Sequence, residues 1–440
     1  MTKQSDIDNQ KVRVNDREQL IYLLTEAAEI EHGLMCTYLY AGWSLKRSVD
    51  EGVSEEQLEA IGRWRKLIRG VAMEEMVHLA MANNMLMSIG SPPHFRRQNF
   101  PVPPGYHPSS LVVRLAPFTR DTLQHFIYLE RPEGMPMDQA PGFESALVYQ
   151  RRAPSTTLTP TAEDFDTVSH LYRGIEQGFE KLAGQLGEST LFAGAPDAQL
   201  GPDVLQLDGL FPVTDLASAL KAVQVIIEQG EGGRDDSEKS PSDLPAAEQS
   251  HYARFKAMGD EYDAFLAADP GFTPYRPVAT DPVMLAPIDE NDNMHMAAAD
   301  AARVLDAANA AYGLMLRLLA SGTGVSRGTE ALRRTEIDAA ISLMHVVGSL
   351  AVALTTLPVN EEGVLCAGMN FHLPRSALAL PQRHAGAALL AERAREIALA
   401  LGQLAGSVAQ VKPELAPRVA ALAADLAAHA ARAPDQQPGA

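Results

Sequence analysis

The chain has 440 residues, of which 46% are hydrophobic and 21% are charged, so it holds enough apolar material for one large helical body or two domains. Acidic residues outnumber basic ones by 56 to 37, and the net charge of -19 argues against binding to nucleic acids or acidic membranes. Cys36 and Cys366 form no Cys-x-x-Cys pair, residues 1–15 lack an apolar signal core, and no run of about 18 apolar residues occurs, so we expect a cytoplasmic protein without disulfides or a membrane span.

The first predicted helix runs from Asp16 to Leu45, with Asn15 or Asp16 as its cap. Its apolar residues recur every three or four positions, and Glu31 lies within that stripe. A second helix is predicted over residues 54–89 and ends at Gly90-Ser91-Pro92-Pro93. The two helices should form an antiparallel pair.

The second helix carries Glu75 and His78 in the same stripe as Leu67, Val71 and Ala82. Residues three apart share a helix face, so both polar side chains are predicted to be buried. A buried carboxylate is costly unless it is paired or binds a metal, and a Glu-x-x-His pair that points into a helical bundle is typical of di-metal carboxylate sites. For one isolated pair, a core histidine beside an ion-paired glutamate is the simpler interpretation.

Between Pro92 and Pro160 the sequence has recurrent prolines and no helical period, and residues 110–118 are the best candidate for a short strand. A segment of this length without regular structure is usually functional or carries structure of its own. We therefore interpret it as a loop that covers one end of the bundle.

Two further helices are predicted beyond this segment. One begins at Thr161 or Asp164, ends near residue 186, and has Glu176 as the only carboxylate in its apolar stripe. The other spans residues 215–229, and Glu231 continues its apolar face beside glycines that end the helix.

A last helix of this region is predicted over residues 245–267, after an exposed polar insertion at 234–242. Glu248 and His251 repeat on it the spacing of Glu75 and His78. Spacing favours Glu248 as the partner of His251, but Glu231 is a rival because a charge at the end of an apolar helix otherwise lacks an obvious reason. Both glutamates stay in the candidate set.

The predicted domains are a metal-binding domain at 16–268 and a C-terminal helical domain at 297–432, separated by a proline-rich linker at 269–296. His345 lies on an apolar face without a carboxylate in register and is predicted to be a core histidine. The chain ends, 1–15 and 433–440, are predicted to be flexible. The alanine-rich C-terminal domain should contain helices near residues 297–320, 329–357, 377–404 and 411–432.

A pair of metal ions bridged by carboxylates needs about six protein ligands, typically four glutamates and two histidines on four helices. The sequence offers seven candidates: Glu31, Glu75, His78, Glu176, Glu231, Glu248 and His251. Imidazole and carboxylate ligands together suit iron or manganese. The sequence therefore predicts a centre with two metal ions, iron or manganese.

Four segments resemble the ferritin-like family: Ile30-Glu31-His32 with Leu34 to Tyr40, Arg69 to Leu79, Glu228 to Gly232, and Ser250 to Phe255. The branch that they resemble is the iminophenyl-pyruvate dimer synthase type, which is associated with bisindole pathways such as violacein biosynthesis. The resemblance implies an all-α fold, with a ferritin-like four-helix bundle, a long inserted loop and an additional C-terminal helical layer or bundle. It also implies a metal site, and it strengthens the case for Glu231 as a metal ligand beyond what spacing alone supports.

Three functions are compatible with this pattern. The first is a non-haem diiron oxidase or oxygenase that uses O2 on a small organic molecule, amino-acid-derived, in secondary metabolism. The second is a metal-storage or detoxification protein, which the single large chain disfavours. The third is a metal-free pathway partner, which would leave several like charges buried together. None of them requires nucleic acid or membrane, and a homo-oligomer is compatible with all three.

Overall fold

The computed structural model describes residues 12–102, 113–143, 158–160, 163, 165–232, 249–284, 295–323, 330–376 and 385–432. The chain forms two compact units, the first made of residues 1–202 and 206–280 and the second of residues 203–205 and 281–440. Within the described ranges all regular structure is helical, apart from four isolated β-bridges. The predicted all-α fold is therefore confirmed.

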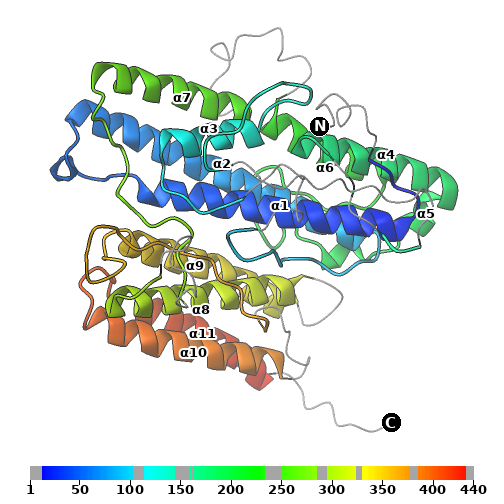
Figure 1. Ribbon diagram of the computed structural model, residues 1–440. Coiled ribbons are helices and arrows are strands. Elements are labelled where there is room, and N and C mark those ends of the chain that lie inside the picture. Colours follow the sequence, from blue (N-terminus) through cyan, green and yellow to red (C-terminus); the bar gives the residue numbers. More distant parts are fainter. Residues whose placement is uncertain are drawn as a thin grey trace. The chain divides into compact units, whose positions relative to one another are not determined.

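The first unit is built on a long hairpin of α1 (Arg17–Ser44) and α2 (Glu55–Ser88). Asp16 caps α1 by accepting a hydrogen bond from a backbone N–H of its first turn. The Arg17 guanidinium donates to the carbonyl of Ile89 at 2.8 Å, so the start of α1 lies beside the end of α2. The two longest helices of the unit thus run antiparallel, side by side, as predicted (Figure 1).

Four shorter helices pack in pairs: α3 (Arg120–Leu129) lies against α7 (His251–Ala268), and α4 (Val168–Leu186) lies against α6 (Leu216–Gly230). Of these, α4 packs on α1, while α6 and α7 both pack on α2. The remaining short elements of the unit are α5 (Glu188–Leu191) and the 3-10 turns η2 (Val49–Glu51) and η3 (Pro196–Ala198).

The helix α3 corrects the prediction that the segment from Pro92 to Pro160 has no helical period. Thr119 caps this helix, which buries Leu123 and Phe126. Prolines on both sides and a length of 10 residues hid its period in the longer sequence window. Of the predicted strand at 110–118, the described part forms one bridge, between Val113 and Val102.

Two predicted helix starts were also wrong. The helix α4 begins at Val168 and α7 begins at His251, each several residues later than the apolar period suggested. In both cases a hydroxyl side chain, Thr167 or Ser250, accepts a backbone N–H of the first turn and fixes the start.

The second unit consists of two helical hairpins, in which α8 packs on α9 and α10 on α11. Further contacts join α8 to α10 and α9 to α11, so each helix has two neighbours. Among described helices, α9 alone is long and apolar enough to cross a membrane. Of its most apolar 18-residue stretch, 56% is buried within the protein. The bounds are Ala299–Gly322, Glu330–Leu354, Gly386–Ala405 and Leu415–Arg432.

His345 on α9 is exposed, which corrects its prediction as a core histidine. Its Nδ1 lies 3.0 Å from the carbonyl oxygen of Ile341 in the preceding turn. The apolar stripe of α9 is wide enough to face both α8 and α11, and His345 falls outside it.

Glu336 of α9 provides a test of the packing in the second unit. Its side chain is buried, accepts a hydrogen bond from Ser321 at 2.8 Å, and burial raises its pKa from 4.5 to about 7. The pKa of Glu336 is higher in the folded chain than in the unfolded chain. Its contribution to the free energy of unfolding is therefore fully present below pH 4.5 and is lost as pH rises through 7. Glu336→Gln should therefore raise the free energy of unfolding by about 2 kcal/mol at pH 8 and change it little at pH 4.5.

Denaturant unfolding of wild type and of Glu336→Gln, each at pH 8 and at pH 4.5, measures this difference. The matched control is Asp338→Asn, which alters an exposed carboxylate on the same helix and should give no such gain. A gain of equal size at both pH values would contradict the buried position of Glu336.

Candidate metal centre

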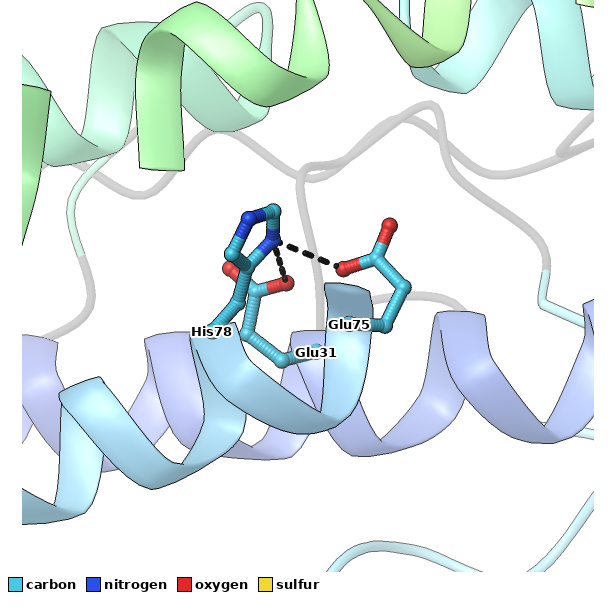
Figure 2. A group of neighbouring side chains, drawn as sticks. All are labelled: Glu31, Glu75 and His78. Atoms are coloured by element: carbon cyan, nitrogen blue, oxygen red, sulfur yellow. Dashed lines mark hydrogen bonds and ion pairs between the residues drawn. The ribbon is translucent and has the colours of Figure 1, made fainter. Parts of the chain in front are cut away.

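The middle of the α1–α2 hairpin brings together Glu31, Glu75 and His78 (Figure 2). Nδ1 of His78 lies 3.1 Å from Oε2 of Glu75 and 3.7 Å from Oε2 of Glu31. All three side chains are 2% exposed, so water contributes little to solvating their charges. The hairpin alone thus supplies two carboxylates and one imidazole.

A second group is formed by Glu75, Glu130 and His251. Nδ1 of His251 lies 3.0 Å from Oε1 of Glu75 and 3.7 Å from Oε2 of Glu130. Within each group the potential ligand atoms lie within 4.8 Å of one another. Glu75 belongs to both groups and faces a different histidine with each of its two oxygens, which is the arrangement of a carboxylate that can bridge two ions.

Four helix ends converge on this centre. Glu130 follows the last residue of α3, and His251 is the first residue of α7. Val168 at the start of α4 and Gly230 at the end of α6 line one pocket with Glu31, Glu75 and His78. The short helices therefore deliver side chains from their ends, whereas α1 and α2 deliver them from their middles.

Four of the candidate ligands, Glu31, Glu130, His78 and His251, are each held by a further hydrogen bond. Tyr172 donates to Oε1 of Glu31 at 2.7 Å, and Tyr38 donates to Oε1 of Glu130. Nε2 of His78 lies 2.7 Å from the amide oxygen of Gln229, and Nε2 of His251 lies 2.8 Å from a carboxylate oxygen of Glu74. Because both partners are acceptors, Nε2 carries the proton and Nδ1 of each ring faces the carboxylates.

The carboxylates and imidazoles shift one another's pKa values. Burial and the charge of Glu75 raise the pKa of Glu31 to about 8. Burial favours neutral His78, but Glu75 and Glu31 outweigh it and raise its pKa to about 10. Burial also opposes ionisation of Glu75, yet His251 and His78 hold the pKa of Glu75 well below its ordinary value. In the metal-free protein, protons therefore supply the positive charge that the carboxylates require.

The residues present fit a metal pair. Nδ1 of His251 is buried and has no hydrogen-bond partner, although Oε1 of Glu75 is 3.0 Å away. An unsatisfied buried nitrogen is costly, and once the proton of Nδ1 has left, a cation between His251, Glu75 and Glu130 would accept its lone pair. Three carboxylates and two imidazoles make a mixed oxygen and nitrogen donor set that suits iron or manganese.

Two predicted ligands among the described residues, Glu176 and Glu231, take no part in these groups. Glu176 is half-buried one turn after Tyr172, and Tyr172 is the residue of that stripe that reaches Glu31. The side chain of Glu231 is 6% exposed, but it accepts hydrogen bonds from Arg173 at 2.6 Å and from the backbone N–H of Glu133 at 2.9 Å.

Glu248 lies outside the described residues. The helix α7 begins at His251 with Ser250 as its cap, and a ligand role of Glu248 stays a prediction.

Glu130 was missed by the sequence reasoning. The signal was present, because Leu123, Phe126 and Glu130 are spaced three and four apart behind Thr119, a good helix cap. The interpretation of this segment as a cover without helices leaves no reason to place its carboxylates on a helix face. The described part of that segment does border the site, since Leu129, Glu130 and Arg131 line its pocket.

The pocket beside the two groups is small. Its cavity volume is about 20 Å³. Glu231 lies on its lining and is fixed by Arg173, which also donates to Glu133 at 2.6 Å. Water or O2 fits this space, and a larger substrate requires the lining side chains to move.

Metal binding should release protons, because the ligands bind in their deprotonated forms. At pH 7 the pKa values of Glu31, about 8, and His78, about 10, keep both groups protonated, and the carboxylates around His251 also raise its pKa. Filling both positions should thus release about three protons, and affinity should fall as pH is lowered. Calorimetric titration in two buffers of different ionisation enthalpy measures this number. Glu31→Gln should reduce it by about one, and equal heats in both buffers would contradict the protonated cluster.

Comparison with known proteins gives a family match and two curated relatives. The sequence model described as ferritin-like matches residues 24–260, which is more than half of the chain. Dichlorochromopyrrolate synthase of Lentzea aerocolonigenes is 29% identical over 422 residues, covering 88% of this chain and 39% of the relative. The 2-imino-3-(indol-3-yl)propanoate dimerase of Chromobacterium violaceum is 28% identical over 387 residues, covering 80% and 33%.

The chain thus spans less than half the length of these curated relatives. Among solved structures, a ferritin-like protein from Caulobacter vibrioides is similar, with a TM-score of 0.47 and 16% sequence identity. The similarity covers 81% of this chain and 99% of that protein.

Proposed function

Because the chain belongs to the ferritin-like family, we propose that it is a non-haem di-metal oxidase or oxygenase that uses O2 on a small organic molecule. The observation that carries the proposal is the pair of three-residue groups that share Glu75. Two iron ions, when bound there, would supply electrons for the reduction of O2. Manganese would fit the same donor set.

The proposal gives each described residue of the centre one role. Glu31 and His78 would hold one ion, Glu130 and His251 would hold the other, and Glu75 would bridge them. Tyr172 and Tyr38 fix the rotation of Glu31 and Glu130 through their hydroxyl groups. The burial of all five ligands keeps bulk water away from reactive groups.

The names of the relatives support an amino-acid-derived substrate. One relative is named as a dimerase of 2-imino-3-(indol-3-yl)propanoate, which is an α-imino acid with an indole side chain. The other is named for the synthesis of dichlorochromopyrrolate. We therefore propose an α-imino acid with an aromatic side chain as substrate, in the biosynthesis of a secondary metabolite. The proposal covers the metal-dependent step, since the chain matches only part of each relative.

The test begins with the metal content of the purified chain after anaerobic addition of Fe(II) or Mn(II). Two ions per chain are expected. The imino acid is then generated from tryptophan by an amino-acid oxidase, and its conversion is followed by mass spectrometry with and without the metal-loaded protein. With catalase present to remove the H2O2 that the amino-acid oxidase releases, a new product that requires the metal and consumes O2 beyond the amount used by that oxidase supports the proposal. A protein that oxidises Fe(II) without any effect on the imino acid, and takes up many ions per chain, would instead be a storage protein.

A further inference from the structure

The two halves of the candidate centre are built from the same types of side chain. Each half has one carboxylate of its own, one histidine that faces the carboxylates with Nδ1, and a share in Glu75. The separate carboxylates, Glu31 and Glu130, each accept a hydrogen bond from a buried tyrosine. The difference lies behind the histidines, at the Nε2 atoms that point away from the carboxylates.

Behind His251 lies the carboxylate of Glu74, with Oε2 at 2.8 Å from Nε2. Arg254 holds this carboxylate with two hydrogen bonds, at 2.9 Å to Oε1 and 2.5 Å to Oε2. Arg254 is itself buried, and its Nε donates to the carbonyl of Gln249 at 2.7 Å. Glu74 is therefore fixed in one orientation by the helix that carries His251.

Behind His78 lies the side-chain amide of Gln229, with Oε1 at 2.7 Å from Nε2. An amide oxygen accepts the Nε2 proton without a formal charge. A carboxylate attracts that proton more strongly, and this makes the opposite ring nitrogen a better electron donor to a metal. Nδ1 of His251 should consequently be the stronger ligand of the two, even though Arg254 offsets part of the charge of Glu74.

We propose that Glu74, clamped by Arg254, is a positioning residue that makes the two metal positions unequal. The position of Glu75, Glu130 and His251 then fills first and binds a divalent ion about 10- to 100-fold more tightly than the position of Glu31, Glu75 and His78. This inference rests on the proposed metal pair. The side chains that would contact the ions do not by themselves determine which position fills first, whereas the groups behind the histidines do.

The experiment titrates the metal-free full-length chain with Mn(II) alone and follows free Mn(II) by electron paramagnetic resonance. Wild type should bind in two resolved steps. Glu130→Gln should remove the tight step, and Glu31→Gln should remove the weak one. Glu74→Gln turns the group behind His251 into an amide, so the two steps should merge to within about 3-fold while the total stays at two ions.

Gln229→Glu is the matched variant, because it places a carboxylate behind His78 and should merge the steps by strengthening the weak one. A merely structural role of Glu74 would weaken both positions together in Glu74→Gln, and that result would overturn the inference. Circular dichroism and thermal melting of each variant show whether it is folded. Two equal steps in wild type would overturn the inference alone, whereas no stoichiometric binding in wild type would overturn the proposed function as well.

Discussion

Glu75→Ala should abolish binding of both metal ions at once and reduce substrate oxidation by more than about 100-fold, beyond the loss expected for a residue that only supports a ligand. The reason is geometric, since Glu75 is the one residue shared by the two groups and faces each histidine with a different oxygen. Metal analysis of the variant after dialysis against Fe(II) or Mn(II) measures the loss. The helical fold should persist, because the apolar core around the centre is large.

Neighbouring carboxylates provide the controls. Glu130→Ala and Glu31→Ala each remove a ligand of one group only, so each variant should keep one ion per chain. Glu231→Gln and Glu176→Gln should keep both ions, because Glu231 is paired with Arg173 and Glu176 belongs to neither group. Full occupancy in Glu75→Ala would rule out the bridging role.

The α1–α2 hairpin could be predicted because several independent signals agree there. The cap at Asp16, a long apolar stripe and the Gly-Ser-Pro-Pro stop after α2 all favour the same two helices. Glu31, Glu75 and His78 follow directly, since a carboxylate inside an apolar stripe of a buried helix must face the interior. The local chain determines this half of the centre.

The other half depends on where short helices begin and end, which an apolar period does not locate. Tyr172 and Glu176 share one face of α4, and the period alone does not tell which of them reaches Glu31. The start of α7 at His251 follows from the Ser250 cap rather than from the apolar stripe. Predicting Glu130 as a ligand requires recognising that a helix, α3, lies between the prolines. Tyr172, His251 and Glu130 each lie at or near a helix end, where a shift of a few residues changes which side chain reaches the centre.

Gly194→Ala should lower the stability of the first unit by about 3 kcal/mol or more. Gly194 follows α5 and donates its N–H to the carbonyl of Ser88 at 2.9 Å, at the end of α2. A Cβ at this position would lie 1.8 Å from the carbonyl oxygen of Met87. That oxygen belongs to the backbone, so relief requires the loop to withdraw from α2 and to give up the hydrogen bond.

Denaturant unfolding of the metal-free chain, followed by circular dichroism, measures the loss. Gly184→Ala is the control, because the same substitution in the exposed part of α4 meets no atom within 4 Å. It should raise stability by up to about 1 kcal/mol, since alanine has the higher helix propensity. The same Gly→Ala substitution should thus lower the free energy of unfolding at position 194 and raise it at position 184. Equal stability of Gly194→Ala and wild type would show that the loop after α5 does not pack against the end of α2, the helix that carries Glu75 and His78.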